Sequence, residues 1–182
     1  QARAYWRRRG LDDKTINRFG LGYAPDDGQA LYQHLRDKGY NQQELDASGL
    51  FKRSQSGRIY CLFWRRVMTP IFDLRGNIIA FGGRVLDDSK PKYVNSPETL
   101  VYHKSDTVFA LQIAKRSASR RFVLCEGYMD VISMHQAGID TAVCACGTAL
   151  TPEQVRLISE YADEVILLSL IHISEPTRQE AI

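Results

Sequence analysis

Short apolar runs alternate with helix-like segments in the last third of the chain. Residues 122–125, 141–146 and 164–168 are rich in apolar, β-favouring side chains, which predicts three buried strands. Between them, residues 129–137 and 151–161 have the spacing of helices, and the second segment begins Thr-Pro-Glu-Gln, a typical helix start. Strands and helices that alternate in this way predict a βαβαβ unit with a parallel sheet.

The first two thirds of the chain mix helical and strand-like spacing. Predicted helices cover residues 2–9, a segment capped by Asp12 or Asp13 that includes Ile16 and Phe19, and residues 30–38, 44–47 and 107–117. Predicted strands cover residues 58–64, 67–72 and 78–81, with a hairpin turn at 73–77 and a loop at 91–97. Pro70 predicts an edge or a bulge in its strand. The predicted fold class is α/β, with an α+β subdomain over residues 1–118 and the βαβαβ unit over 119–168.

The composition is that of a globular protein of one or two domains. The 182 residues are 44% hydrophobic and 25% charged, with a formal net charge of +3. This mild excess permits nucleic-acid binding without requiring it. The basic residues are clustered, although each cluster alone also fits a solvated face; the clusters are Arg7 to Arg9, Arg65 and Arg66, and Lys115, Arg116, Arg120 and Arg121.

The four cysteines argue against a zinc ribbon, because none form a CxxC pair and no histidine stands at ligand spacing. Cys125 and Cys144 lie in apolar runs, so we expect reduced core thiols and a cytoplasmic protein. No apolar run approaches the length of a membrane span, and no signal peptide is visible. The chain lacks an initiator methionine, so we expect an internal piece of a longer protein.

Two carboxylates follow the first strand of the βαβαβ unit. Glu126 stands at the strand end, Gly127 allows a sharp turn, and Asp130 falls on the first turn of the next helix. The carboxyl ends of parallel strands are where α/β sheets place their chemistry, and two such carboxylates could hold Mg²⁺. The alternative is a solvated Glu126 with Asp130 favouring the helix N-terminus.

A pair of glycines precedes a candidate binding arginine. Gly82 and Gly83 let another group approach the backbone closely, and Arg84 follows them directly. The alternative for Arg84 is a surface salt bridge.

Four motifs in a fixed order carry a resemblance to a known family. They are Phe81-Gly-Gly-Arg84, Pro91-Lys-Tyr-Val-Asn-Ser-Pro-Glu-Thr99, Glu126-Gly-Tyr-Met-Asp130 and Gly147-Thr-Ala-Leu150. Together they resemble the RNA polymerase domain of bacterial DnaG-type primases, and the later part is similar to a Toprim fold. The start Arg9-Gly-Leu and the segment Gly20 to Pro25 are also similar to that family, so the resemblance covers residues 2–168.

The resemblance implies a role for each candidate residue. Glu126 would be the Toprim glutamate and metal contact, with Asp130 as its companion acid. Arg9, Arg84, Lys92 and Lys104 would bind template and nucleotide, with Tyr93, Asn95 and Ser96 in the same loop motif. Tyr93 could stack on a base or be a packed aromatic. Phosphoryl transfer depends on such charge neutralisation.

The resemblance also implies the reaction and its partners. It implies synthesis of RNA primers on a single-stranded DNA template from ribonucleoside triphosphates, with Mg²⁺ or Mn²⁺ as cofactor. Zinc would bind only in an upstream domain absent from this chain. A replicative helicase would bind through a C-terminal domain that is also absent.

The chain departs from the family pattern at two places. An Asp-x-Asp metal motif is expected near positions 170 and 172, where this sequence has Leu170 and His172. We therefore expect residues 169–182 to be a non-native tail and the fragment alone to be inactive; the alternative is a native C-terminus that has diverged from the family. Cys61-Leu-Phe-Trp64 also stands where the family has charged residues, which puts template contacts from this strand in doubt.

Two other classes of function fit the same residues. One is another Toprim enzyme, such as a primase-helicase or a topoisomerase-like nuclease; the basic first half and the Pro-Lys-Tyr loop favour a primase. The other is a non-catalytic module that binds single-stranded DNA through basic and aromatic side chains. Metal-dependent primer synthesis would separate them.

Overall fold

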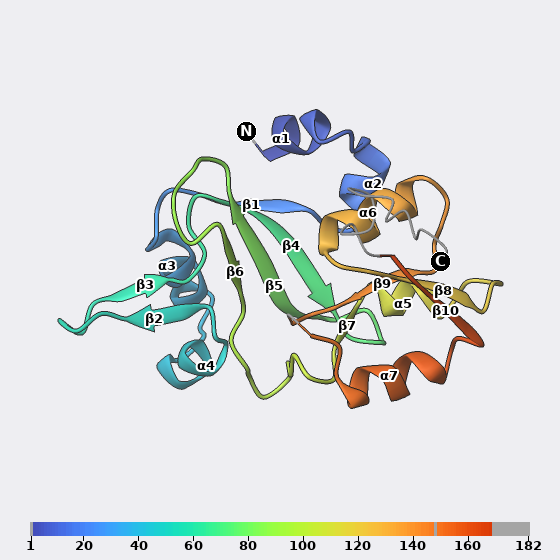
Figure 1. Cartoon of the computed structure of the whole chain (residues 1–182). Helices are drawn as coiled ribbons and strands as arrows, with labels where there is room; N and C mark the ends of the chain where they lie inside the picture. Colours follow the sequence, from blue (N-terminus) through green and yellow to red (C-terminus); the bar gives the residue numbers. More distant parts are fainter. Residues whose placement is uncertain (1, 148, 169–182) are drawn as a thin grey trace, which may run out of the picture.

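Two four-stranded sheets and a two-stranded ribbon organise residues 2–147 and 149–168, the part of the chain that the computed structural model describes (Figure 1). The first sheet has the order β1-β4-β5-β6 and is antiparallel throughout. Its strands are β1 (Gly22–Ala24), β4 (Arg66–Phe72), β5 (Ile78–Val85) and β6 (Tyr93–Asn95). The ribbon pairs β2 (Phe51–Arg53) with β3 (Ile59–Cys61).

The second sheet confirms the predicted parallel βαβαβ unit. Its order is β10-β8-β9-β7, and β8 (Arg121–Cys125) pairs in parallel with both β9 (Ala142–Ala145) and β10 (Glu164–Leu167). A short antiparallel strand, β7 (Val108–Phe109), is added at one edge, so the sheet is mixed. At the other edge β10 is exposed, with Leu167 the most accessible of its apolar side chains.

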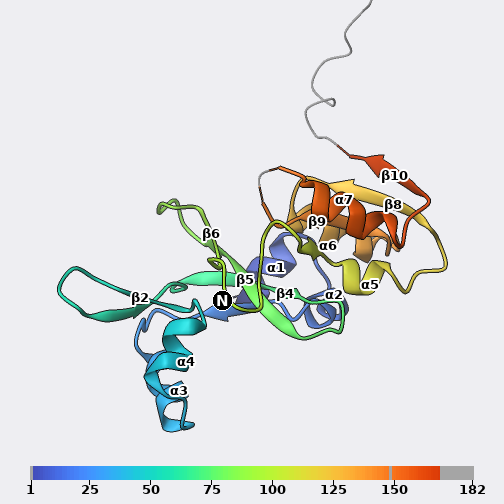
Figure 2. The same cartoon turned by 90° about the horizontal axis from the view of Figure 1, so that it is seen from below.

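Seven helices flank these sheets in the described part of the chain. They are α1 (Ala2–Arg8), α2 (Asp13–Arg18), α3 (Ala30–Asp37), α4 (Gln42–Ala47), α5 (Leu111–Ala114), α6 (Tyr128–Gln136) and α7 (Pro152–Ser159). Figure 2 shows α3, α4 and the β2–β3 ribbon on one side of the first sheet and the second sheet with α5 to α7 on the other. None of these helices has both the length and the apolar composition to span a bilayer.

Local capping explains where two of the predicted helices begin. The Asp12 side chain accepts a hydrogen bond from the backbone N–H of Thr15, which starts α2. Thr151 and Gln154 form the predicted capping box of α7. The Gln154 amide is fully buried and also donates to the carbonyl oxygens of Lys104 and Thr107, at 2.7 and 2.9 Å. One side chain thus starts a helix and fixes the loop that precedes β7.

The predicted helix over residues 107–117 is wrong in its first half. Val108 and Phe109 form β7, Ala110 has a positive φ of 65°, and only residues 111–114 are helical. Val108 and Phe109 are both buried, and their pairing with Ala145 and Cys144 of β9 outweighs the helical spacing of the sequence.

The loop predicted over residues 91–97 contains a strand. Tyr93 to Asn95 pair with Arg84 to Gly82 of β5, which continues to Val85 rather than ending at Phe81. No alternation of apolar residues marks β6, because it is an edge strand held by backbone hydrogen bonds. The edge or bulge predicted at Pro70 is confirmed. On one side β1 pairs with β4 only from Arg66 to Met68, which leaves Pro70 without a partner there among the described residues, and the register of β4 with β5 shifts between Ile71 and Phe72.

One hydrophobic cluster joins the two sheets. Ile71 from β4, Phe109 from β7 and Ile132 from α6 are nearly inaccessible and belong to it. A second cluster of buried residues lies within the second sheet and its helices, where Phe122 of β8 packs with Ile158 of α7. The Gln136 side chain at the end of α6 accepts from the Asp12 N–H at 2.8 Å and donates to the Gly10 oxygen at 2.7 Å. These contacts fix the N-terminal helices against α6. The predicted boundary at residues 118 and 119 stays a prediction, and β7 shows that residues before it contribute to the second sheet.

All four cysteines are buried free thiols, as predicted for Cys125 and Cys144. Burial raises the pKa of Cys125 and of Cys146 to about 11, and it also raises the pKa of Cys61 and Cys144. Because the thiolate is the reactive form, we expect an aromatic disulfide reagent at mildly alkaline pH to label the folded chain far more slowly than the unfolded chain. Rapid labelling of all four thiols in the folded protein would contradict a reduced, closed core.

Candidate functional site

A cavity of about 410 Å³ opens where the two sheets meet. Its walls come from α1, from β4, β5 and β6, from the turn between β8 and α6, and from the end of β9. Six of the candidate residues predicted from the sequence line it: Arg9, Arg84, Tyr93, Asn95, Glu126 and Asp130. Segments far apart in the chain therefore bring carboxylates and guanidinium groups to one cavity.

Glu126 and Asp130 form the acidic wall. Gly127 is the N-cap of α6, and a Cβ atom at this glycine would lie 3.4 Å from Asp130 Oδ2. The Asp130 carboxylate therefore lies against Gly127, in the turn that follows Glu126. The N-terminus of α6 favours negative charge at this point. Two carboxylates beside an open cavity are ligands of the kind that a divalent cation takes together with water and substrate phosphates.

Arginine and tyrosine side chains form the basic part of the cavity wall. Arg84 donates from Nη1 to the Tyr5 hydroxyl at 2.6 Å and from Nε to the Tyr93 hydroxyl at 3.1 Å. Arg9 donates from Nε to the same Tyr5 hydroxyl at 3.3 Å, and this hydrogen bond raises the pKa of Arg9. The Tyr93 side chain is 59% exposed, so a face of its ring is open to solvent.

The two predicted glycines let aromatic rings reach β5. A Cβ atom at Gly82 would lie 2.7 Å from Cε2 of Tyr128, and one at Gly83 would lie 2.8 Å from Cδ1 of Phe63. Tyr128 is the first residue of α6 and stands between Glu126 and Asp130 in the sequence. Burial raises the pKa of the Tyr128 hydroxyl. The absence of a side chain at Gly82 thus sets how closely α6, which follows the acidic wall, approaches β5.

Arg66 contradicts the interpretation of its cluster as a solvated face. Its side chain is buried and donates from Nη2 to the Pro91 oxygen at 2.9 Å and from Nη1 to the Lys92 oxygen at 3.3 Å. Burial lowers the pKa of Arg66. Ser96 is also buried, and its Oγ accepts from the Phe81 N–H at 3.0 Å. Both residues hold the β6 segment in place rather than face the cavity.

Lys92 and Lys104 do not line this cavity. Lys92 is exposed and directly precedes β6, the strand that carries Tyr93 and Asn95. Lys104 is half-buried in the loop before β7, where its N–H donates to Glu98 Oε1 at 3.1 Å. Their predicted contacts with template or nucleotide stay predictions.

Sequence reasoning missed Tyr5, Trp6 and Tyr128 in the cavity region. Tyr5 lies on α1 and Arg9 follows directly after its last residue, so the helical spacing of four residues places the two side chains on the same side. That signal was available for Arg9 but not for Arg84, which is 79 residues away from Tyr5. Trp6 and Tyr128 carried no local signal beyond their apolar character.

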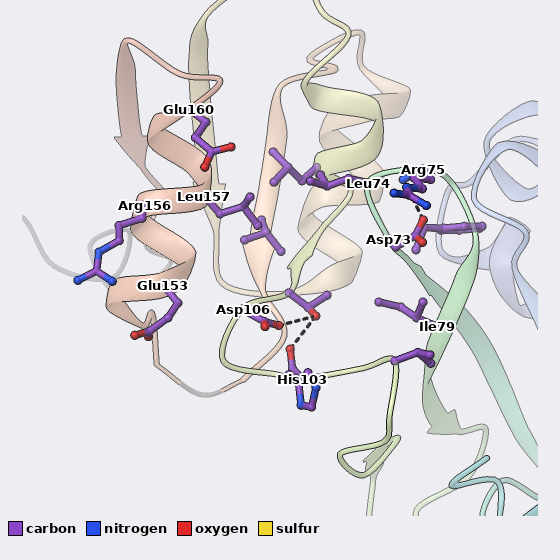
Figure 3. Close-up of a pocket in the computed structure, with 15 residues that line it drawn as sticks. Asp73, Leu74, Arg75, Ile79, His103, Asp106, Glu153, Arg156, Leu157 and Glu160 are labelled. Carbon is purple, nitrogen blue, oxygen red and sulfur yellow. Dashed lines mark hydrogen bonds between the residues drawn. The ribbon is translucent and has the colours of Figure 1, made fainter. Parts of the chain in front are cut away.

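A second cavity, of about 580 Å³, is larger but contains none of the predicted residues (Figure 3). It lies between the β4–β5 turn, the loop around His103 and α7. Its charged lining includes Asp73, Glu153 and Glu160 as well as Arg75 and Arg156, and Leu74 and Leu157 give it an apolar part. Mixed charges without a candidate metal pair make it a weaker candidate than the first cavity.

Comparison with protein families matches residues 1–115 to the family described as "DNA primase catalytic core, N-terminal domain". Residues 123–170 match the family described as "Toprim-like". The DNA primase of Clostridium acetobutylicum is 45% identical over 168 residues, which are 92% of this chain and 28% of the relative. The DNA primase of Deinococcus radiodurans is 46% identical over 167 residues, 90% of this chain and 29% of the relative. The chain thus spans less than a third of these relatives.

Solved structures agree with the family matches. A DnaG primase catalytic domain bound to ssDNA has a TM-score of 0.83 and 39% identity, covering 91% of this chain and 54% of that chain. The RNA polymerase domain of Mycobacterium tuberculosis primase DnaG, in complex with a double-stranded DNA oligomer with a 6-nucleotide overhang, has a TM-score of 0.84 and 38% identity. That match covers 91% of this chain and 55% of the other.

Proposed function

Because this chain belongs to the DNA primase catalytic core family, we propose that it is part of an enzyme that synthesises RNA primers on single-stranded DNA. One observation carries the proposal: a single cavity joins the carboxylates of Glu126 and Asp130 to the guanidinium groups of Arg9 and Arg84. Acids that can hold a metal ion and cations that can hold phosphates are the two requirements of phosphoryl transfer.

Each wall of the cavity has a proposed task. Glu126 and Asp130 would hold Mg²⁺ or Mn²⁺, an ion that neutralises charge on phosphate oxygens when bound. Arg9 and Arg84 bind phosphate oxygens through their planar N–H donors. Tyr93 offers an exposed ring on which a base can stack, and Asn95 offers an amide beside it. Lys92 and Lys104 extend the positive charge toward the template.

The partners follow from the proposed reaction. A single-stranded DNA template and ribonucleoside triphosphates are the substrates, and we propose that the longer protein meets the replicative helicase in the cytoplasm. The expected Asp-x-Asp positions, 170 and 172, and the expected non-native tail at 169–182 lie outside the described residues. We propose that the fragment alone is inactive and that activity requires a native sequence in this region.

A non-catalytic DNA-binding module would use the same arginines but would not need Glu126. Primer synthesis by the longer protein with native sequence after residue 168 therefore decides between the two functions, with and without divalent metal. Metal-dependent synthesis supports the proposal, and another Toprim activity, such as strand cleavage, would replace it. DNA binding without either reaction would favour the non-catalytic module.

We expect Arg84→Ala and Lys92→Ala to weaken binding of a fluorescent single-stranded oligonucleotide to this chain. Each phosphate contact that is lost should make the dependence of affinity on salt shallower by about one unit of slope at most. Fluorescence anisotropy over a series of salt concentrations measures both quantities. Lys38→Ala, in an exposed position after α3, is the matched control and should bind like the original chain. An unchanged affinity and slope for Lys92→Ala would assign that lysine to the solvated surface.

A further inference from the structure

One phenol oxygen connects the two arginines of the cavity. The Tyr5 hydroxyl accepts from Arg84 Nη1 at 2.6 Å and from Arg9 Nε at 3.3 Å. Arg84 reaches it from β5 and Arg9 from the turn after α1. Two guanidinium groups that share one acceptor are held close together despite their mutual repulsion.

The Tyr5 side chain is itself fixed. It is only 7% exposed, and its ring packs edge-on against Trp6 with centroids 4.9 Å apart. The guanidinium carbon of Arg84 lies 5.6 Å from the Tyr5 ring centroid and 5.7 Å from that of Tyr93. That of Arg9 lies 5.9 Å from the Tyr5 ring. The buried Tyr5 ring therefore fixes the positions of both guanidinium groups.

This arrangement leaves donors for a ligand. Tyr5 takes only Nε of Arg9. In Arg84 the two tyrosine hydroxyls take Nε and Nη1, and Nη1 also donates to the Val85 oxygen at 3.4 Å. A guanidinium group has five N–H donors in a planar fork, so N–H groups of both arginines are left to face a second acceptor. A phosphate group is the anion whose oxygens match two such forks and whose charge offsets their repulsion.

We propose that Tyr5 is a positioning residue that holds Arg9 and Arg84 as a pair for one phosphate group of a nucleotide or of single-stranded DNA. This inference rests on the proposed function, because it assigns Tyr5 a supporting role in the cavity where that function is proposed. Tyr5 does not touch the phosphate; its hydroxyl fixes the direction of the donors that do. The prediction is a coupling between residue 5 and residue 84 in phosphate binding.

A double-mutant cycle on the full chain tests the coupling. Tyr5→Phe keeps the ring against Trp6 and removes only the acceptor, and we expect it to weaken binding of a labelled oligothymidine by about tenfold, the effect of one hydrogen bond to a charged group. In an Arg84→Gln background the same change should have a much smaller effect. Tyr40→Phe, at an exposed position between α3 and α4, is the matched control. ATP replaces the oligonucleotide in a second arm, so that a loss confined to one arm identifies the source of the phosphate.

Each outcome supports or overturns a separate claim. If Arg84→Gln weakens binding but Tyr5→Phe does not, the positioning role is wrong and the proposed function stands. If Arg84→Gln leaves the affinity for both probes unchanged, the proposed binding site itself is wrong. An equal effect of Tyr5→Phe with and without Arg84 would overturn the coupling and assign Tyr5 to the fold alone. If Tyr5→Phe lowers the midpoint of thermal unfolding, Arg9→Gln takes its place, because this change leaves the buried ring untouched. It is then combined with Arg84→Gln in a second double-mutant cycle.

Discussion

Replacing Glu126 by glutamine should reduce primer synthesis by about 10²-fold to 10³-fold or more in a full-length primase that contains this segment. The change keeps the size and shape of the side chain but removes its negative charge beside Asp130 and replaces one acceptor oxygen by an amide donor. Since divalent metal binding by carboxylates depends on that charge, the fold should persist while catalysis is lost. Primer synthesis in Mg²⁺ and in Mn²⁺, together with circular dichroism of the same preparations, measures the two effects separately.

Glu160→Gln is the matched control for this experiment. Glu160 lies at the end of α7, beside the second cavity and outside the acidic wall, so primer synthesis should be unaffected. Full activity of Glu126→Gln in Mg²⁺ would show that the metal is held elsewhere. Loss of helical signal in the variant would instead assign Glu126 a structural role, and its effect on synthesis could not then be attributed to charge.

The second large effect is expected from a single methyl group on β5. In Gly82→Ala the new Cβ atom would lie 2.7 Å from Cε2 of Tyr128 and 3.2 Å from Oδ1 of Asn95. Tyr128 is packed against Phe109, with ring centroids 4.6 Å apart, so its ring has little room to move away. We expect the free energy of unfolding to fall by about 1–3 kcal/mol, the range for overpacking in a close-packed core. Denaturant titration followed by fluorescence measures it.

Gly28→Ala separates this steric effect from the general consequence of replacing glycine. No heavy atom lies within 4 Å of a Cβ atom at Gly28, and its φ is not positive. Its stability should therefore change by no more than about 0.5 kcal/mol. Equal stabilities of the two alanine variants would mean that the ring of Tyr128 moves freely and that Gly82 does not set the approach of α6 to β5.

The acidic half of the site could be predicted because it is local. Strand, turn and helix N-terminus follow one another from residue 121 to residue 130, so the position of Glu126 and Asp130 depends on backbone rules that act over a few residues. The sequence also predicted that some group approaches Gly82 and Gly83 closely. It could not predict that these groups are the rings of Tyr128 and Phe63, because both reach β5 only through tertiary packing.

The remaining errors have the same physical origin. β6 and β7 are strands because β5 and β9 offer them backbone partners, and no period within residues 93–95 or 108–109 encodes those partners. Arg66 was grouped with Arg65 as surface charge because the sequence cannot show that carbonyl groups of Pro91 and Lys92 surround it. Tyr5 was missed for the same reason, since its contact with Arg84 exists only when α1 lies beside β5.

The exposed edge of the second sheet has a practical consequence for work with this chain. Val165, Ile166 and Leu167 present apolar surface along β10, and in the described part of the chain β8 is its one strand partner. An open apolar edge strand is a template for pairing with another molecule. We therefore expect concentrated solutions to associate through intermolecular sheet extension, and light scattering on a dilution series would measure this association before binding experiments.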